Sequence, residues 1–299
     1  MAPETTGVSE TLSLRAHAKL NLSLRVLARE ESGYHAIETL LIRLRLADGI
    51  ELATVAEPGV RLTVSGNPEL PTDASNLCVR AAEAVAHELG LRGGIRLRLE
   101  KRIPVGAGLG GGSADAAAVL AGLQQLLGHP LSRDRLWQLA GELGSDVPFG
   151  LCETPMALAW ERGRRLIPLD APPPLPVVVA VPDFPISAGD AYGWLAADRA
   201  AGVARAPGSA GLPDASALRD LATLQRLAVN DLEGPVFDRY PRLRDIRDAL
   251  NELGARIALL CGSGSCVAGV FADEGARDRA ATKLGTWEDL SVLVTSTLR

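Results

Sequence analysis

The chain has 299 residues, of which 47% are hydrophobic and 4% aromatic, and its formal net charge is -5. This length allows two domains with aliphatic cores, and the lack of a dominant basic stripe argues against nucleic-acid binding. No apolar run approaches the ~20 residues of a membrane span, and no signal or transit peptide is visible, so we expect a cytoplasmic protein without a membrane partner. The four cysteines form no C-x-x-C pair, and buried thiols are expected rather than disulfides or zinc ligands.

The first predicted element is a long strand over residues 12–26, where apolar and polar side chains alternate strictly. Lys19 and Asn21 fall on its polar face, where a solvated lysine is the ordinary outcome. Gly33-Tyr34-His35 then predicts a turn.

Three more strand patterns and a helix pattern follow. Apolar residues alternate on both sides of Asp48-Gly49, which predicts a hairpin with its turn at this dipeptide. A further strand is predicted over residues 60–64. Residues 76–89 have helical periodicity, and Gly90 predicts the end of that helix.

The glycine-rich segment P-V-G-A-G-L-G-G-G-S-A, residues 104–114, is the strongest functional signal. A strand pattern at 95–100 precedes it, and a helical pattern at 116–127 follows it. A loop without side chains that leads into a helix directs backbone N–H groups and the positive end of the helix dipole at one point. Such an arrangement favours phosphate binding.

A Rossmann turn, a Walker A loop and a plain linker fit this segment less well. Gly106, Gly108 and Gly111 match G-x-G-x-x-G, but a Rossmann unit needs an acidic residue at the end of a strand about twenty residues later, where this chain begins another helix. A Walker A loop needs a lysine after the glycines, and none is present. A flexible linker is not expected between a clear strand and a clear helix.

A further helix is predicted over residues 132–143, with Gly144 at its end. Asp146 follows in Gly-Ser-Asp-Val-Pro, and Pro148 predicts that Val147 is not helical, so that the carboxylate lies on a rigid corner. From spacing alone, an aspartate that caps a helix or forms an Asx-turn is the commoner outcome. A general base near an acceptor hydroxyl is the functional alternative.

The second half of the chain predicts a βαββαβ order, which is a ferredoxin-like arrangement. Proline-rich residues 171–176 mark a joint, and we expect one domain at 1–168 and another at 169–299. Residues 200–216 predict a long loop. The expected elements are a buried strand at 177–181, a helix at 190–199, a helix at 243–253, strands at 256–261 and 266–271, a helix from 274 and a strand near 292.

Several segments resemble motifs of the GHMP kinases, the group that includes galactokinase, homoserine kinase, mevalonate kinase and phosphomevalonate kinase. The matching segments are Ala18-Lys19-Leu20-Asn21-Leu22, Gly33-Tyr34-His35, residues 104–114, Gly144-Ser145-Asp146-Val147-Pro148, Asn230-Asp231-Leu232-Glu233 and Gly262-Ser263-Gly264-Ser265-Cys266. The resemblance implies an α+β fold with an N-terminal domain like ribosomal protein S5 domain 2 and a ferredoxin-like C-terminal domain.

The motifs are most similar to one branch of this family. Its members use ATP to phosphorylate the 2-hydroxyl of 4-diphosphocytidyl-2-C-methyl-D-erythritol, giving the 2-phosphate and ADP in non-mevalonate isoprenoid precursor synthesis. The resemblance therefore implies a kinase that binds ATP, Mg²⁺ and this small molecule, as a monomer or a homodimer.

The resemblance also implies roles for individual residues. Asp146 would accept the hydroxyl proton, and Lys19 would pair with it and neutralise charge near the transferred group. Ser113 would cap the helix and help to hold phosphates and magnesium, whereas Asp115 either faces away or helps to orient magnesium; no set of metal-ligand residues is assigned. The acceptor would contact Asn21, Tyr34, His35, Asp146, Gly262 and Ser263, and ATP would contact Pro104, Val105, Gly106, Ala107, Gly108, Leu109, Gly110, Gly111, Gly112, Ser113 and Ala114.

Three residues depart from the family pattern, namely His17, Ala114 and Ala188. Ala114 replaces a second serine and removes one hydroxyl from the loop, and Ala188 replaces a threonine at a position that contacts substrate in the family. Three other functions stay open at this point: a GHMP kinase for homoserine or a mevalonate derivative, a nucleotide sensor without catalysis on the same fold, and a Rossmann oxidoreductase.

Overall fold

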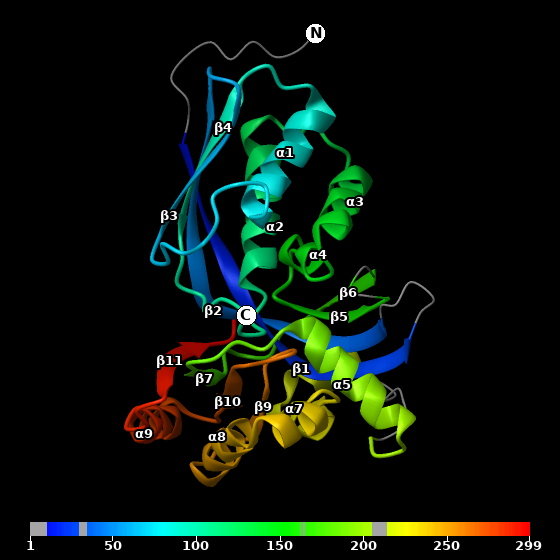
Figure 1. Ribbon diagram of the computed structural model, residues 1–299, viewed down its shortest axis with the longest axis vertical. Helices are drawn as coiled ribbons and strands as arrows, with labels where there is room; N and C mark the ends of the chain where they lie inside the picture. Colours follow the sequence, from blue (N-terminus) through cyan, green and yellow to red (C-terminus); the bar gives the residue numbers. More distant parts are fainter. Residues whose placement is uncertain (1–10, 30–34, 162, 164, 205–213) are drawn as a thin grey trace. The chain divides into compact units, whose positions relative to one another are not determined.

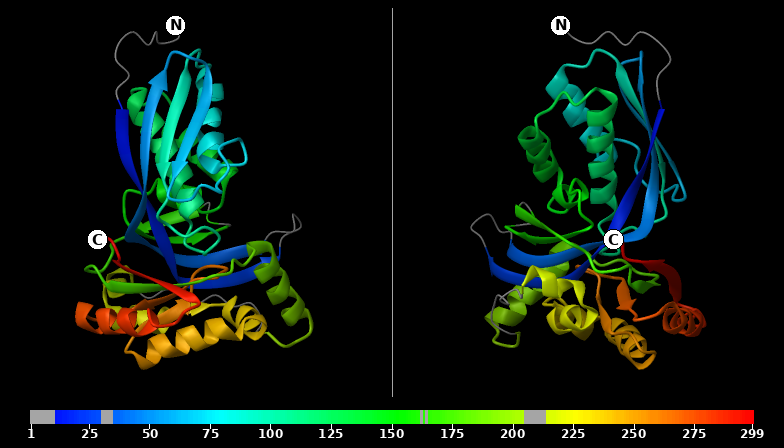
Figure 2. Two further views of the ribbon diagram at one scale, coloured as in Figure 1. Left: turned by 60° about the vertical axis from the view of Figure 1, so that its left-hand side comes forward. Right: turned by 180° about the vertical axis from the view of Figure 1, so that it is seen from behind.

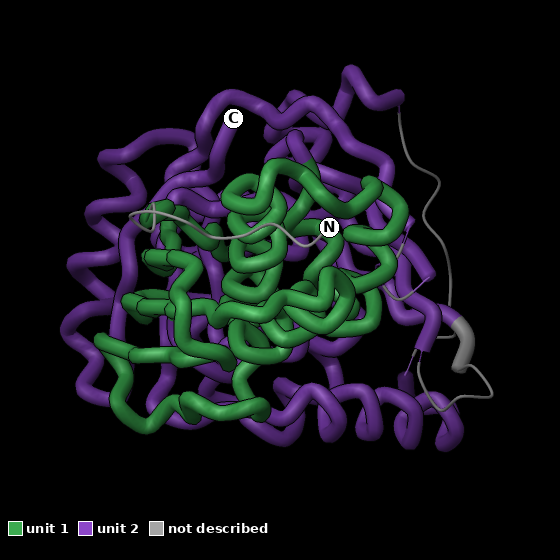
Figure 3. Tube along the Cα trace, turned by 90° about the horizontal axis from the view of Figure 1, so that it is seen from above, with its two compact units in different colours: residues 1–18, 46–103, 110–152 green, residues 19–45, 104–109, 153–299 purple. Residues whose placement is uncertain are grey.

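The computed structural model describes residues 11–29, 35–161, 163, 165–204 and 214–299. The chain forms two compact units that interleave along the sequence (Figure 3). Unit 1 contains Met1–Ala18, Leu46–Ile103 and Gly110–Cys152, and unit 2 contains Lys19–Arg45, Pro104–Leu109 and Glu153–Arg299. Within the described residues, no helix has the length and apolar character needed to cross a membrane.

The strands of unit 1 follow the order β3-β4-β2-β1, with helices on one face (Figure 1). Strands β1 (Thr11–Arg29) and β2 (His35–Val55) are long and continue into unit 2, while β3 (Gly59–Ser65) and β4 (Gly94–Glu100) belong to unit 1 alone. β4 pairs antiparallel with β2 and parallel with β3. The helices are α1 (Leu77–Leu89), α2 (Gly111–Leu126), α3 (Arg133–Leu143) and the single turn α4 (Val147–Gly150).

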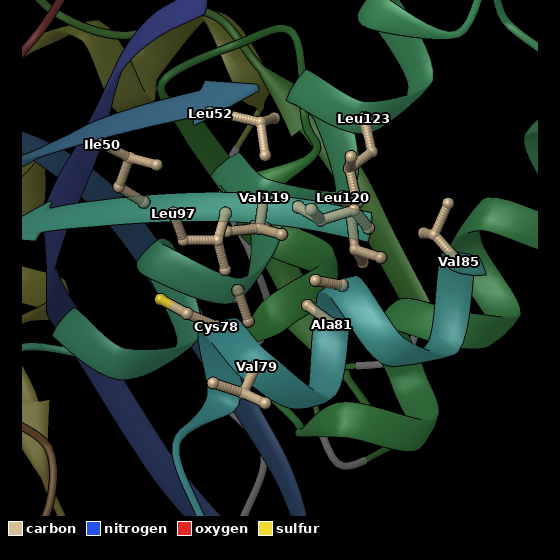
Figure 4. Packing of buried hydrophobic residues seen from close by; sticks show 14 of the residues in the cluster. Ile50, Leu52, Cys78, Val79, Ala81, Val85, Leu97, Val119, Leu120 and Leu123 are labelled. Atoms are coloured by element: carbon tan, nitrogen blue, oxygen red, sulfur yellow. The ribbon is translucent and has the colours of Figure 1, made fainter. Parts of the chain in front are cut away.

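Aliphatic side chains from the strands and from α1 and α2 make the core of unit 1 (Figure 4). Ile50 and Leu52 of β2, Leu97 of β4 and Leu120 of α2 belong to this core, and all are at most 2% exposed. The predicted ends of α1 and the predicted start of α3 are confirmed: Asn76 caps α1 with its side chain, Gly90 ends α1 in the left-handed conformation, and Ser132 caps α3. Local capping signals therefore determined where α1 and α3 begin.

The predicted hairpin at Asp48-Gly49 is wrong, because β2 runs without a turn from His35 to Val55. The Asp48 carboxylate is buried and accepts hydrogen bonds from the backbone N–H groups of Arg102 (2.6 Å) and Ile103 (2.8 Å). Asp48 thus serves a segment 55 residues away instead of closing a local turn.

Unit 2 contains the predicted ferredoxin-like sheet, with strand order β11-β7-β10-β9 and antiparallel pairing throughout. Helices α8 and α9 lie on one face of this sheet (Figure 2). This order places the first and third strands of the βαββαβ pattern side by side. The strands are β7 (Pro176–Pro182), β9 (Ile257–Leu260), β10 (Val267–Val270) and β11 (Leu290–Ser296), and the helices are α5 (Ala188–Ala200), α8 (Pro241–Glu252) and α9 (Glu274–Leu284).

Unit 2 also has elements that the sequence pattern did not predict. They are β5 (Met156–Trp160), β6 (Arg165–Leu169), β8 (Val229–Asn230), α6 (Leu221–Leu227), α7 (Glu233–Arg239) and a 3-10 turn, η1 (Ala215–Arg219). β5 pairs with β2 and β6, and β8 pairs with β1. β5 is buried on both faces, which explains why it lacks the alternation of a half-buried strand. The fold is α+β as predicted, and its antiparallel pairs are incompatible with a doubly wound Rossmann sheet.

Candidate active site

Every second residue of the glycine loop has a backbone conformation that glycine adopts more easily than other residues. Gly106, Gly108 and Gly110 have φ values of 69°, 76° and 70°, in the left-handed region. Between them, Ala107 and Leu109 are buried, with 4% and 1% exposure. The glycines therefore turn the chain, while the two apolar side chains anchor it.

Carbonyl groups of this loop accept hydrogen bonds from the rest of unit 2. Leu109 O accepts from the backbone N–H of Lys19 (3.0 Å), and Ala107 O accepts from that of Cys266 (3.4 Å). A Cβ atom at Gly108 would overlap with the carbonyl oxygen of Cys261. The loop is thus held against β1 and against the Gly262–Ser265 turn. Because these carbonyl oxygens are already engaged, a phosphate would be bound by backbone N–H groups.

The helix that follows the loop begins earlier than predicted. α2 starts at Gly111 with Gly110 as its N-cap, and no side chain caps it. The prediction that Ser113 is the N-cap is therefore wrong, since Ser113 is the third residue of the helix. Glycine at the start lets the helix follow the loop directly, and its first N–H groups lack intrahelical acceptors, which suits an anion.

Lys19 is buried among polar groups of unit 2, with 7% exposure, so the solvated lysine does not apply. Its Nζ donates to Asn21 Oδ1 (2.6 Å) and to the Gly108 carbonyl (3.0 Å). Asn21 Nδ2 in turn donates to Thr39 Oγ1 (2.8 Å), whose hydroxyl donates to Ser23 O. The network places the ammonium beside the glycine loop and fixes its direction.

The Gly262–Ser265 turn lies against the same group. Gly262 has a φ of 53°, and a Cβ built there would lie 3.3 Å from Lys19 Nζ, 3.4 Å from Asn21 Oδ1 and 3.1 Å from Gly108 O. The structure therefore brings together Lys19, Asn21, the first half of the loop and Gly262, as the motifs predicted. All of these residues belong to unit 2.

Asp146 lies in unit 1, at the N-cap position of α4. Val147 is the first residue of this turn of helix and Pro148 the second, so the prediction that Pro148 keeps Val147 out of helical geometry is wrong. Proline is compatible with the first turn of a helix, where its missing N–H is not needed. The half-buried Asp146 side chain makes no capping hydrogen bond, so the capping role is excluded.

The Asp146 turn packs beside the start of α2 within unit 1. A Cβ at Gly150 would overlap with Ala117, and one at Gly144 would lie 3.8 Å from Ser113 Oγ. Asp146 therefore lies next to the start of α2. The pairing of Asp146 with Lys19, which belongs to the other unit, stays a prediction.

A buried charge cluster under the start of α2 was not predicted. Lys101 Nζ donates to Asp115 Oδ2 (2.8 Å) and to Asp48 Oδ2, and all three side chains are at most 5% exposed. Asp115 therefore faces inward, which decides against its alternative role in orienting magnesium. Its Oδ1 has no hydrogen-bond partner within the described residues.

Burial and the charges within the cluster shift the pKa values of Asp115 and Lys101. Burial raises the pKa of the Asp115 carboxyl to about 7, although the Lys101 ammonium acts in the opposite direction and Asp48 adds to the rise. The same two carboxylates raise the pKa of Lys101 against the effect of its own burial. One ammonium thus serves two carboxylates.

His35 is the first residue of β2, and its ring stacks on that of Tyr192 of α5 at a centroid distance of 5.5 Å and an angle of 24°. Tyr34, the other residue predicted to contact the cytosine, lies outside the described residues. The contact of Tyr192 with His35 was not predicted, because a lone tyrosine in a helical pattern does not indicate a partner more than 150 residues earlier.

Comparison with known protein families shows the family to which this chain belongs. Residues 76–154 match the GHMP kinases N terminal domain, and residues 213–288 match the GHMP kinases C terminal domain. The chain belongs to the GHMP kinase family. This GHMP kinase is a small-molecule kinase that uses ATP, so the Rossmann oxidoreductase is excluded.

Relatives of this GHMP kinase align with it over nearly the whole chain. A 4-diphosphocytidyl-2-C-methyl-D-erythritol kinase of Anaeromyxobacter dehalogenans (strain 2CP-C) is 42% identical over 95% of this chain and 90% of that relative. One of Geobacter sp. (strain M21) is 39% identical over 91% of this chain and 94% of that relative. A crystal structure of 4-(cytidine 5'-diphospho)-2C-methyl-D-erythritol kinase, 36% identical, covers 96% of this chain and 100% of its own with a TM-score of 0.79.

Proposed function

We propose that this chain transfers the γ-phosphoryl group of ATP to the 2-hydroxyl of 4-diphosphocytidyl-2-C-methyl-D-erythritol, giving the 2-phosphate and ADP. The observation that carries the acceptor is the similarity, at 39–42% identity over more than 90% of the chain, to relatives named as kinases of this compound. The place of this reaction is the synthesis of isoprenoid precursors by the non-mevalonate pathway.

The environment of Lys19 supports its proposed catalytic role. Phosphoryl transfer needs in-line positioning and stabilisation of charge on the transferred group. A buried ammonium that Asn21 and the Gly108 carbonyl already orient does not have to reorganise during the reaction, so it stabilises charge more than a solvated lysine would. Lys19 would therefore act on the transferred phosphoryl at the edge of the glycine loop.

In this proposal, Asp146 accepts the proton of the acceptor hydroxyl. Its carboxylate does not serve as the cap of α4, and α4 packs against the first turns of α2. Backbone N–H groups of residues 104–114, above all those at the start of α2, would hold the ATP phosphates. Asn21, Gly262 and Ser263 would contact the acceptor, and the position of Gly262 next to Lys19 and Asn21 supports this assignment.

We propose that Mg²⁺ binds together with ATP and neutralises charge on the β- and γ-phosphates. Within the described residues, no group of three or more histidine, cysteine, aspartate or glutamate side chains is placed to hold a metal ion. Asp115 does not fit as a ligand, because it is buried against Lys101. Magnesium commonly keeps few protein ligands when phosphates supply the others, so the half-buried Ser113 at the start of α2 is the residue that fits best.

The cytosine of the acceptor is proposed to bind at His35. The stacked rings of His35 and Tyr192 offer a flat surface of the kind on which a base stacks. The contribution of Tyr34, the oligomeric state and the cytoplasmic location stay predictions. The domain division at 168/169 also stays a proposal, which the positions of the two family matches support.

A panel of acceptors tests this function. The protein is incubated with ATP and, in turn, 4-diphosphocytidyl-2-C-methyl-D-erythritol, homoserine and mevalonate, and ADP formation is measured. We expect turnover with the first compound only. Turnover with another acceptor would assign a different GHMP kinase activity, and ATP binding by calorimetry without turnover on any acceptor would identify a nucleotide sensor.

Two variants test the assigned residues. Asp146→Asn is expected to lower kcat by about 10²–10⁴-fold and Lys19→Met by about 10²–10³-fold, while ATP still binds to Asp146→Asn. Asp134→Asn, at an exposed position in the first turn of α3, is the matched control and should keep the parent kcat. A parent-like kcat in Asp146→Asn would remove Asp146 from the mechanism.

A further inference from the structure

Asn230 is a buried amide whose side chain bonds to three backbone groups. It ends β8, is 3% exposed, and donates from Nδ2 to the carbonyl oxygens of Gly262 (2.7 Å) and Leu260 (2.9 Å). Its Oδ1 accepts from the backbone N–H of Leu232 (3.0 Å). One side chain thus holds both the end of β9 and the first residue of the glycine turn.

The backbone of Asn230 is fixed to the strand that carries Lys19. β8 pairs in parallel with β1, where Leu24 is the partner of Asn230. Asp231 strengthens this connection, because its Oδ2 accepts from the backbone N–H of Val26 (2.9 Å) and from the Arg199 guanidinium (3.0 Å). The amide therefore links β1 to the turn through a short and rigid path.

Glu233 of the same segment also bonds to β9, at the same residue, Leu260. Glu233 Oε1 accepts a hydrogen bond from the backbone N–H of Leu260 (2.8 Å). The segment Asn230-Asp231-Leu232-Glu233 is thereby a clamp on the strand that leads into the turn. Gly262, just beyond the end of this strand, lies against Lys19 and Gly108.

We propose that Asn230 is a positioning residue that holds the Gly262–Ser265 turn against Lys19 and the glycine loop. This inference rests on the proposed function only in assigning Lys19 to phosphoryl transfer. A carbonyl of Gly262 that loses its donor would turn toward water or another donor, and the turn would move away from Lys19. Displacements of about 1 Å in such a site lower rates by up to about 100-fold.

The test replaces the amide by its isostere, Asn230→Asp. An ionised aspartate cannot donate to the two carbonyl oxygens, whereas a protonated one can donate to one of them. We expect kcat of this variant at pH 8 to be about 10–100-fold below that of the parent, with less than about threefold change in KM for ATP. Toward pH 5.5, we expect the ratio of its kcat to that of the parent to rise several-fold. Asn230→Leu has no donor at any pH and should show no such recovery. Burial raises the pKa of Glu233, and because both variants keep Glu233, the comparison between them corrects for its titration.

Gln124→Glu is the matched control. Gln124 is also a buried amide that bridges backbone groups, since it donates to Leu131 O (2.6 Å) and accepts from Leu131 N (3.2 Å), but it lies near the far end of α2. We expect comparable loss of stability without loss of kcat. An equal loss of kcat in Gln124→Glu, or a parent-like kcat in Asn230→Asp at pH 8, would overturn the proposal.

A readout without substrate separates this proposal from the proposed function. Amide hydrogen exchange of residues 261–266 reports the turn directly, and Asn230→Asp should lose protection there relative to the parent at pH 8 and regain part of it at pH 5.5. Unchanged protection overturns the positioning role whichever acceptor the enzyme uses, and an inactive parent with the expected exchange pattern refutes only the kinase activity. If Asn230→Asp does not fold, Asn230→Ser, which keeps one hydroxyl donor, is measured in the same way.

Discussion

The buried cluster of Lys101, Asp48 and Asp115 makes the stability of this enzyme depend on pH in a direction opposite to that of most aspartates. The pKa of Asp115 is about 7 in the folded chain, against 3.8 for an ordinary aspartate, because burial disfavours its charge. Between these values the folded chain keeps a proton that the unfolded chain releases. The free energy of unfolding therefore decreases as the pH rises from about 4 to 7.

The magnitude follows from the two pKa values. The difference between 7 and 3.8 corresponds to about 4 kcal/mol in total, of which roughly 2–3 kcal/mol is lost between pH 5 and pH 8. Asp115→Asn removes this contribution and keeps the shape of the side chain. The free energy of unfolding of the variant minus that of the parent should therefore increase by roughly 2–3 kcal/mol between pH 5 and pH 8.

Chemical denaturation of the two proteins at pH 5, 6, 7 and 8 measures this difference, and the titration of groups distant from the cluster cancels in it. The neighbouring ionisable groups are Asp48 and Lys101, and the Cys78 thiol of α1, whose pKa burial raises further. Asp134→Asn, at an exposed position, should show no such dependence. A difference between parent and Asp115→Asn that stays constant over this pH range would refute the assignment of a proton to the cluster.

Two further predictions concern the same region and the glycine loop. Lys101→Met removes the shared partner of two buried carboxylates and should lower the free energy of unfolding at pH 8 by about 3–5 kcal/mol; a loss below about 1 kcal/mol in denaturation experiments would show that the carboxylates are stabilised in another way. Gly108→Ala should cost more than about 3 kcal/mol, because the new methyl group would overlap with the Cys261 carbonyl. Gly202→Ala, also at positive φ but in open space, should cost only about 1–2 kcal/mol, and equal losses at both glycines would contradict the close approach of the loop to that carbonyl.

The parts of the fold that the sequence predicted are those with local causes. Asn76 and Gly90 predict both ends of α1, and the alternation over residues 12–26 predicts the course of β1. The strand, loop and helix around the glycine segment were predicted from local patterns too, and Gly106, Gly108 and Gly110 adopt the left-handed conformation that glycine favours. Each of these features depends on residues that are close together in the sequence.

The errors occurred where a distant partner overrides a local signal. Asp48-Gly49 is a strong turn signal, yet the Asp48 carboxylate is used by N–H groups of residues 102 and 103, and the strand continues. Pro148 usually marks a break, but here it lies in the first turn of a helix that packs on α2 through Gly150 and Ala117. Local chemistry indicated the residue types of these sites but not their partners.

The polar residues of the active site follow the same distinction. Lys19 and Asn21 were expected on an exposed strand face, and only the contact of that face with the glycine loop and the Gly262 turn makes it a buried site. Asn230 and Glu233 stand in a motif of the sequence, but the motif does not show their partners, which are backbone groups about 30 residues away and leave no pattern of side chains. A motif therefore identifies residues, whereas the role of a positioning residue such as Asn230 is found only when each buried donor and acceptor is traced to its partner.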